Sequence, residues 1–131
     1  MQLRIRDSRG RTLVEAKQAL PDGRVRRRGL LLSEKRVRGE AWVQAARRGV
    51  AEELGSAAPA AVTLDEASHR VRTVRKDSMS YPGLSTAYEV HTADAAVAGL
   101  PEESFETREA RPGGELVTTW EWHQQPPPDM E

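Results

Sequence analysis

From Ala41 onward, the apolar residues of this chain change from an alternating spacing to a helical one. Four of them fall within about 80° on a helical wheel of 100° per residue, so they form one stripe for burial. They are Val43, Ala46, Val50 and Leu54. This spacing predicts an amphipathic helix over 40–55, with Gly55 as the left-handed residue that closes it.

The segments before this helix have the pattern of β-strands. Leu3 and Ile5 alternate with polar residues, and a Ser-Arg-Gly turn leads into the run 12–16, which predicts a pair of strands. The segment 24–32 mixes β-branched, basic and apolar residues and predicts another strand. Gly29 within it is expected to weaken this strand or to mark a bulge.

Further strands are expected after the helix. They lie at 69–76, 84–91 and 116–123. A Pro-Gly turn joins the first two, and a loop rich in Pro and Glu, 99–114, precedes the last. In the last strand, Leu116, Trp120 and Trp122 share one side. The order of strands, one helix and more strands predicts an α+β fold with a mixed or antiparallel sheet.

The length of 131 residues suits one domain, which we expect at 1–124, followed by a disordered Pro-rich tail at 125–131. With three Trp, two Tyr and one Phe, the core is expected to be mostly aliphatic. Twenty basic residues balance twenty acidic ones, so neither a nucleic-acid partner nor a membrane surface is expected. The chain has no Cys, no apolar run that spans a bilayer and no signal-peptide core. We therefore expect a soluble intracellular protein, in the cytoplasm or in an organelle.

Beside its apolar stripe, the predicted helix has an acidic side. Positions 49, 52 and 53 lie within about 100° of one another on the wheel, and two of these residues are Glu52 and Glu53. Neighbouring carboxylates are ligands for a hard cation such as Mg²⁺. Arg48 precedes Glu52 by four residues and is expected to pair with it. The alternative is a solvated helix face with an ion pair of little energetic value.

The register of these residues resembles the signature of the Nudix hydrolases. In that signature, a Gly is followed after six positions by a Glu and after eight more by Arg-Glu, a hydrophobic residue, any residue, Glu-Glu, any residue and Gly. The matching residues here are Glu40, Arg48, Val50, Glu52, Glu53 and Gly55. The resemblance implies a Nudix-like α/β/α sandwich with a mixed sheet and one principal helix, the second helix being short or absent.

Two positions depart from the signature. The Glu that should follow Arg48 is Gly49, and the first Gly is Glu34. In the family, the helical Glu residues bind the metals, so the resemblance implies a site with one ligand removed and a weakly held ion. Gly costs about 1 kcal/mol relative to Ala inside a helix, so either a contact or a bound group needs the space, or catalysis has lapsed. Glu34 is a candidate for lending a carboxylate from the loop.

The resemblance also implies a function. Glu52 and Glu53 would hold Mg²⁺ or Mn²⁺, and Glu40 and Arg48 would complete the catalytic set. The ligand would be a nucleoside diphosphate linked to another moiety, with weak hydrolysis or none. The alternative is a catalytically inactive module of the same fold that binds protein or RNA. The sequence leaves open whether the chain forms a homodimer.

Other residues have two interpretations each. Arg24, Arg26 and Arg28 would project from one face of their strand, either to bind substrate phosphates or to pair with acids across the sheet. Acids in the late loop are candidates for a further metal ligand or are solvated charges. They are Glu102, Glu103, Glu106 and Glu109.

The aromatic residues and the histidines complete the candidates. Tyr81, Trp120 and Trp122 would either stack on a nucleobase or, as we expect, pack in or beside the core. The histidines have no metal-ligand spacing and are not expected to form a site. They are His69, His91 and His123.

Overall fold

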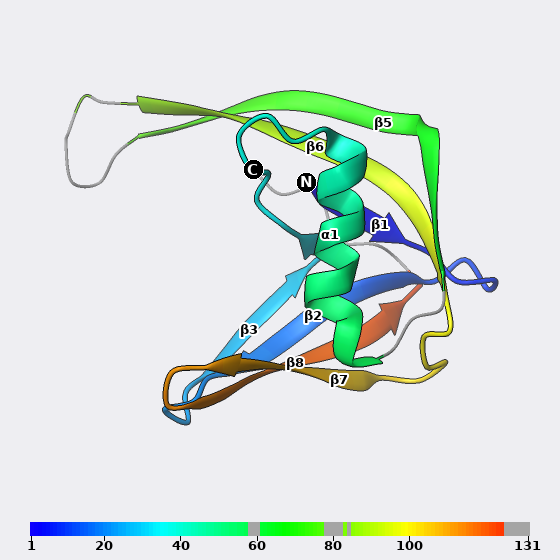
Figure 1. Ribbon diagram of the computed structural model, residues 1–131, viewed down its shortest axis with the longest axis vertical. Coiled ribbons are helices and arrows are strands. Elements are labelled where there is room, and N and C mark those ends of the chain that lie inside the picture. The colour runs from blue at the N-terminus through cyan, green and yellow to red at the C-terminus, as the bar shows by residue number, and fades with distance from the viewer. Residues whose placement is uncertain (58–60, 78–82, 84, 125–131) are drawn as a thin grey trace.

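The computed structural model describes residues 1–57, 61–77, 83 and 85–124. Within them, eight strands form two four-stranded sheets, and one α-helix packs against both (Figure 1). The predicted α+β class, with a mixed sheet and one principal helix, is therefore confirmed. No helix in the described part of the chain is long and apolar enough to cross a membrane.

The first sheet is the mixed one. It contains β1 (Gln2–Ile5), β4 (Leu32–Ser33), β5 (Ala61–Asp77) and β6 (Ser85–Ala98) in the order β4-β1-β6-β5. Strand β1 runs parallel to β6 and antiparallel to β4. Its partners on β6 begin at Thr92, so the earlier part of β6 pairs with β5 and the two strands continue past β1 as a ribbon (Figure 1).

The second sheet is antiparallel throughout. It contains β2 (Thr12–Ala19), β3 (Val25–Leu30), β7 (Phe105–Arg111) and β8 (Gly114–His123) in the order β3-β2-β8-β7. The expected pairing of the first two strands is wrong, because β1 and β2 belong to different sheets and one bridge, between Arg6 and Thr12, links their ends. The turn between them carries the chain from one sheet to the other.

Strands β5, β6 and β7 differ most from the prediction, and the predicted strand 24–32 is divided into β3 and β4 of different sheets. Strand β7 lies inside the expected loop 99–114, where charged residues on an edge strand hide the alternation of Phe105 and Thr107. Strands β5 and β6 are longer than expected. Their extra length is rich in Ala, which is depleted in strands, yet Ala93 and Ala95 are buried against the core.

Gly29 marks an irregularity, as expected. Its φ of 67° lies in the left-handed region, which favours glycine, and the register between β2 and β3 shifts beside it. After the bulge, Leu30 still pairs with Glu15, and the chain then enters β4 of the other sheet.

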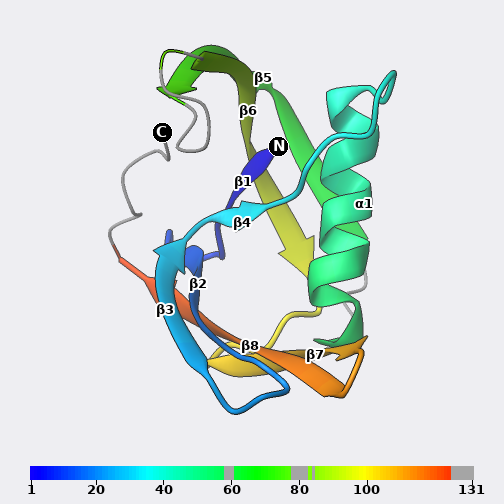
Figure 2. The ribbon, with the colours of Figure 1, turned by 90° about the vertical axis from the view of Figure 1, so that its left-hand side faces the viewer.

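The helix α1 (Trp42–Leu54) runs along one side of both sheets and contacts β4, β5 and β7 (Figure 2). Its buried residues are Ala45, Ala46, Gly49, Val50 and Leu54. The predicted stripe is thus confirmed except at Val43, which is only partly buried. Gly55 has a φ of −55°, so the expected left-handed ending is wrong, since the chain continues into a 3₁₀ turn, η1 (Gly55–Ala57).

The core is mostly aliphatic, as the composition predicts. Trp120 is its largest fully buried side chain, and its Nε1 donates to Thr107 Oγ1 at 2.9 Å. Trp122 packs at the edge of the core, and its Nε1 donates to the carbonyl oxygen of Pro101 at 3.0 Å. Both tryptophans therefore support the packing interpretation, while Tyr81 and the tail 125–131 lie outside the described residues.

Candidate functional site

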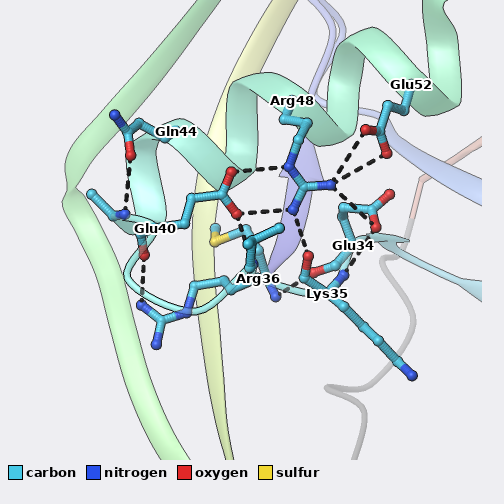
Figure 3. Close-up of polar contacts among 10 residues, drawn as sticks. Glu34, Lys35, Arg36, Glu40, Gln44, Arg48 and Glu52 are labelled. Atoms are coloured by element: carbon cyan, nitrogen blue, oxygen red, sulfur yellow. Dashed lines mark hydrogen bonds and ion pairs between the residues drawn. The ribbon is translucent and has the colours of Figure 1, made fainter.

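Arg48 joins the helix to the loop that precedes it (Figure 3). Its Nε and Nη2 donate to the two carboxylate oxygens of Glu40, each at 2.9 Å, and Nη2 also donates to the carbonyl oxygen of Lys35 at 2.6 Å. Its Nη1 lies 3.3 Å from Glu52 Oε2 and 3.5 Å from Glu34 Oε1. The expected pair of Arg48 with Glu52 is present, but its shortest side-chain contacts are with Glu40.

Glu40 is held in its ionised form by these contacts. Hydrogen bonds from Arg48 and from the backbone N–H of Val37, at 2.9 Å, lower the pKa of Glu40 to about 2. The same pairing with Glu40 raises the pKa of Arg48. Gly39, with a φ of 80°, makes the turn that brings Glu40 to this position. Arg48 and Glu40 therefore act as a clamp that fixes the loop on the helix.

Glu34 lies directly over Gly49. A Cβ on Gly49 would stand 3.1 Å from Glu34 Cβ, 3.6 Å from Glu34 Cγ and 3.5 Å from Leu32 Cδ2. The first distance is shorter than side chains normally tolerate. The backbone of Glu34 is also fixed, because its N–H donates to the carbonyl oxygen of Met1 at 2.9 Å and its carbonyl accepts from the Met1 amino group at 2.8 Å. Gly49 thus provides the space that the Glu34 side chain occupies.

The carboxyl of Glu34 lies beside that of Glu53. Burial, together with the negative charges of Glu34 and Glu15, raises the pKa of Glu53 to about 7. A hydrogen bond with the Glu34 carboxyl and the charge of Glu109 act in the same direction. Acids from the loop before the helix, from β2 and from β7 therefore converge on Glu53.

Glu15 is the member of this group that the sequence did not single out. Its side chain is 7% exposed, its Oε1 accepts no hydrogen bond, and the nearest cationic contact is Arg28 Nε at 3.4 Å. Burial raises the pKa of Glu15 despite Arg28. A signal was present, because Glu15 shares a strand face with the core residue Leu13.

The two Glu residues expected to bind metal together face different partners. Glu52 is 53% exposed and pairs with Arg48, whereas Glu53 is half-buried and lies beside Glu34. In the described residues, no three His, Asp or Glu side chains already stand in the arrangement of a metal site. The carboxylates that come together are those of Glu34 and Glu53, with Glu15 behind them.

The three candidate arginines at the start of β3 and within it have partners in the sheet or in the turn before it. Arg24 Nε pairs with Asp22 Oδ2 at 2.7 Å, and Arg26 Nη2 donates to Gln18 Oε1 at 2.6 Å. Arg28 contacts both Gln18 and Glu15. Of the three, Arg28 forms the ion pair with the acidic group, and Arg26 is near enough to act on the pKa of Glu15.

The late acids are divided between β7 and the turn before it. Glu106 pairs with Arg108 and Glu109 pairs with Arg111, and both acids lie on β7 instead of in a loop. Glu109 is near enough to Glu53 to affect its pKa. Glu102 and Glu103 are exposed, and Arg11 Nη2 donates to the backbone carbonyl of Glu102 at 3.1 Å.

Two histidines form a stack that the sequence did not predict. The rings of Trp42 and His69 are parallel with centroids 4.3 Å apart, and His91 stacks on His69 at 5.1 Å. His69 Nε2 and His91 Nδ1 share a hydrogen bond of 2.8 Å. Burial lowers the pKa of His91. The stack fastens the start of α1 to the first sheet.

Comparison of this chain with known protein families, with curated proteins and with solved structures finds no match.

Proposed function

We propose that this chain is a Nudix-like domain that binds a nucleoside diphosphate linked to another moiety through a divalent cation held at Glu34 and Glu53. The observation that carries the proposal is the contact of Glu34 with Gly49. Compared with the signature, Glu stands at position 34 in place of Gly, and Gly stands at position 49 in place of Glu. The carboxylate of Glu34 therefore lies over the helix beside Glu53.

The chemistry of this group fits a hard cation. Mg²⁺ and Mn²⁺ take oxygen ligands, and Mg²⁺ usually retains several waters, so two or three carboxylates suffice. Glu34 and Glu53 repel each other when both are ionised, and Glu15 offers a buried oxygen that accepts no hydrogen bond. A divalent cation would compensate these charges. Glu52 would stay at the exposed edge of this site, where it pairs with Arg48 and orients the guanidinium.

The fold is compatible with this proposal. The helix packs against a mixed sheet and a second sheet. Its buried side contains Gly49, and its partly buried edge carries Glu53. A Nudix-like sandwich with one principal helix is therefore part of the proposal.

Each residue would have a separate role in this site. A bound Mg²⁺ would supply charge stabilisation at the phosphate oxygens of the ligand. Arg48 and Glu40 keep the loop that bears Glu34 in place. Arg28, which already contacts Glu15, is the cation of β3 best placed to meet a phosphate. In the hydrolytic form of the proposal, water would attack one phosphorus of the pyrophosphate, the bridging P–O bond would break, and the other phosphate-bearing part would leave, with Glu53 at the reacting centre.

Turnover assays test the enzymatic form of this proposal. Nucleotide-sugars, dinucleoside polyphosphates and oxidised nucleotides would be incubated with and without Mg²⁺, and released phosphate or nucleotide measured. We expect metal-dependent turnover or binding that Glu53→Gln abolishes and that the matched control Glu115→Gln, an exposed acid on β8, leaves unchanged. Absence of both turnover and nucleotide binding would overturn the proposal.

One observation favours the second candidate, an interaction module of the same fold. The ribbon formed by β5 and β6 carries Val71 and Tyr88, each 49% exposed, and a β6 edge that β1 leaves uncovered. Thermal melting separates the two candidates, since a ligand at a hundred times its dissociation constant stabilises by about 2.7 kcal/mol. A melting temperature indifferent to Mg²⁺ and nucleotides would favour the interaction module.

A further inference from the structure

The face of the first sheet that points away from the helix carries a group of arginines. Leu3 and Ile5 of β1 pack in the core, so the alternate residue Arg4 lies on the opposite face. Register places Arg70 of β5 beside Thr92 of β6 and Arg72 beside Val90 on this same face. The face is separate from Gly49, Glu53 and the rest of the acidic group.

Arg72 is the residue on this face whose hydrogen bonds are incomplete. Its Nε and Nη2 are buried and have no hydrogen-bond partner. These two N–H groups lie on the same edge of the guanidinium, which is the edge that binds two oxygens of a carboxylate or phosphate at once. A buried guanidinium without acceptors is costly, so an acceptor for this edge is expected in the functional state.

The surroundings of Arg72 are positively charged and already ordered. Arg70 Nη1 donates to the carbonyl oxygens of Ala67 and His69 at 3.1 and 2.8 Å, which fixes it at the bulge of β5. Arg4 Nη1 lies 3.1 Å from Asp94 Oδ1, so this carboxylate orders Arg4 beside the two arginines of β5. Among the described residues, Arg70 and Arg72 are the charged groups of β5 that line this place, and they favour an anion.

A small depression lies at this group. It is lined by Arg4, Ser68, Arg70, Arg72, Val90 and Thr92, and its volume is about 90 Å³. Pockets for whole organic ligands usually measure about 300–1,000 Å³. The depression therefore has room for a single anionic group and not for a nucleoside.

We propose that Arg72, supported by Arg4 and Arg70, binds a phosphate group on this face of the first sheet. The paired Nε and Nη2 of Arg72 would donate to two phosphate oxygens, and the neighbouring guanidinium groups would balance the remaining charge. The phosphate is either free or the terminal group of a larger molecule that stays outside the depression. This site is independent of the cation site at Glu34 and Glu53.

The test is a titration of the full chain with inorganic phosphate and with glycerol phosphate, followed by backbone amide NMR signals at constant ionic strength and without divalent metal. We expect a saturable shift of signals from β5 and β6 near Arg72, with chloride giving none. Arg72→Gln should weaken binding at least about tenfold, and Arg72→Lys, which keeps the charge but loses the two-oxygen edge, should weaken it less. Arg75→Gln, an exposed arginine on the other face of β5, is the matched control and should bind as the wild type does.

Several results would overturn this site. One is the absence of a saturable shift with either phosphate compound. Another is equal binding by the Arg72→Gln and Arg75→Gln variants, and a third is binding of acetate as tight as that of phosphate. Tighter binding of glycerol phosphate than of inorganic phosphate would assign the site to a phosphate ester, and the reverse order would assign it to the free ion. Should Arg72→Gln fail to fold, the comparison of Arg72→Lys with the wild type decides. Since metal is absent throughout, failure of the cation site leaves these results unaffected.

Discussion

Glu34 Cβ lies 3.1 Å from the point at which a Cβ on Gly49 would stand. The two positions that depart from the Nudix signature, Gly49 and Glu34, are therefore in contact. Gly49 has no side chain, and the side chain of Glu34 occupies the space beside it. Such a pair should be coupled energetically, since residues in contact show non-additive effects on stability.

A double-mutant cycle tests the coupling of these two residues. In the Glu34→Gly background, Gly49→Ala should raise the free energy of unfolding by about 1 kcal/mol, the gain expected from helix propensity. In the wild-type background, the same substitution should gain much less or lose stability, because Glu34 is held by Met1 and cannot move aside easily. Denaturant unfolding measures both values.

The exposed helix residue Ala51 provides the control for this cycle. Ala51→Gly should cost about 1 kcal/mol whichever residue occupies position 34. Equal effects of Gly49→Ala in the two backgrounds would show that the contact has no energetic consequence.

Exchanging the two residues tests whether the carboxylate matters more than its place in the sequence. The variant Glu34→Gly/Gly49→Glu moves the carboxylate to the helix and removes the side chain from position 34 of the loop. We expect it to keep cation binding, whereas Glu34→Gly alone should weaken the cation at least about tenfold, as loss of a metal-supporting group does. Gly49→Glu alone should destabilise the fold, because both side chains would compete for one space. If the exchanged variant binds the cation as weakly as Glu34→Gly alone does, this account is contradicted.

The clamp between Arg48 and Glu40 predicts an acid-sensitive stability. The pKa of Glu40 is lowered from 4.5 to about 2 in the folded protein, so its contribution is present above about 4.5 and is lost as the pH falls towards 2. Glu40→Gln should therefore lower the melting temperature at neutral pH and have little effect near pH 2. Glu66→Gln, an exposed acid on β5, is the control and should not reproduce this pattern.

Glu53 predicts the opposite dependence on pH in the metal-free protein. Its pKa is raised from 4.5 to about 7, so the folded state holds a proton that the unfolded state releases, and stability falls as the pH rises through this interval. Glu53→Gln should remove this part of the pH dependence in melting experiments. A wild-type protein equally stable at pH 5 and pH 8 in the absence of metal would speak against the acidic group.

Two features, the buried side of the helix and one ion pair on it, could be predicted from the sequence because both depend on local spacing. The period of the apolar residues specified the buried side of α1, and the four-residue spacing of Arg48 and Glu52 specified their contact. Strand β7 was hidden because an edge strand with one inward face carries many charges, and the ends of β5 and β6 were hidden by Ala.

The acidic group was only partly visible from the sequence. Glu52 and Glu53 are adjacent on the helix, but their partners depend on a loop and on a strand that are distant in sequence. Glu34 reaches Glu53 because the clamp and the contacts of Met1 hold its loop, and Glu15 comes from the other sheet. Local periodicity contains no information on such contacts between sheets.

Titration of the protein with Mn²⁺, followed by the loss of the free-ion electron paramagnetic resonance signal and repeated in competition with Mg²⁺, tests the central claim most directly. The account predicts saturable binding to the wild type that weakens at least about tenfold in both Glu34→Gln and Glu53→Gln and is unchanged in Glu115→Gln. Absence of binding in the wild type, or equal binding by all four proteins, would contradict a cation site formed by Glu34 and Glu53.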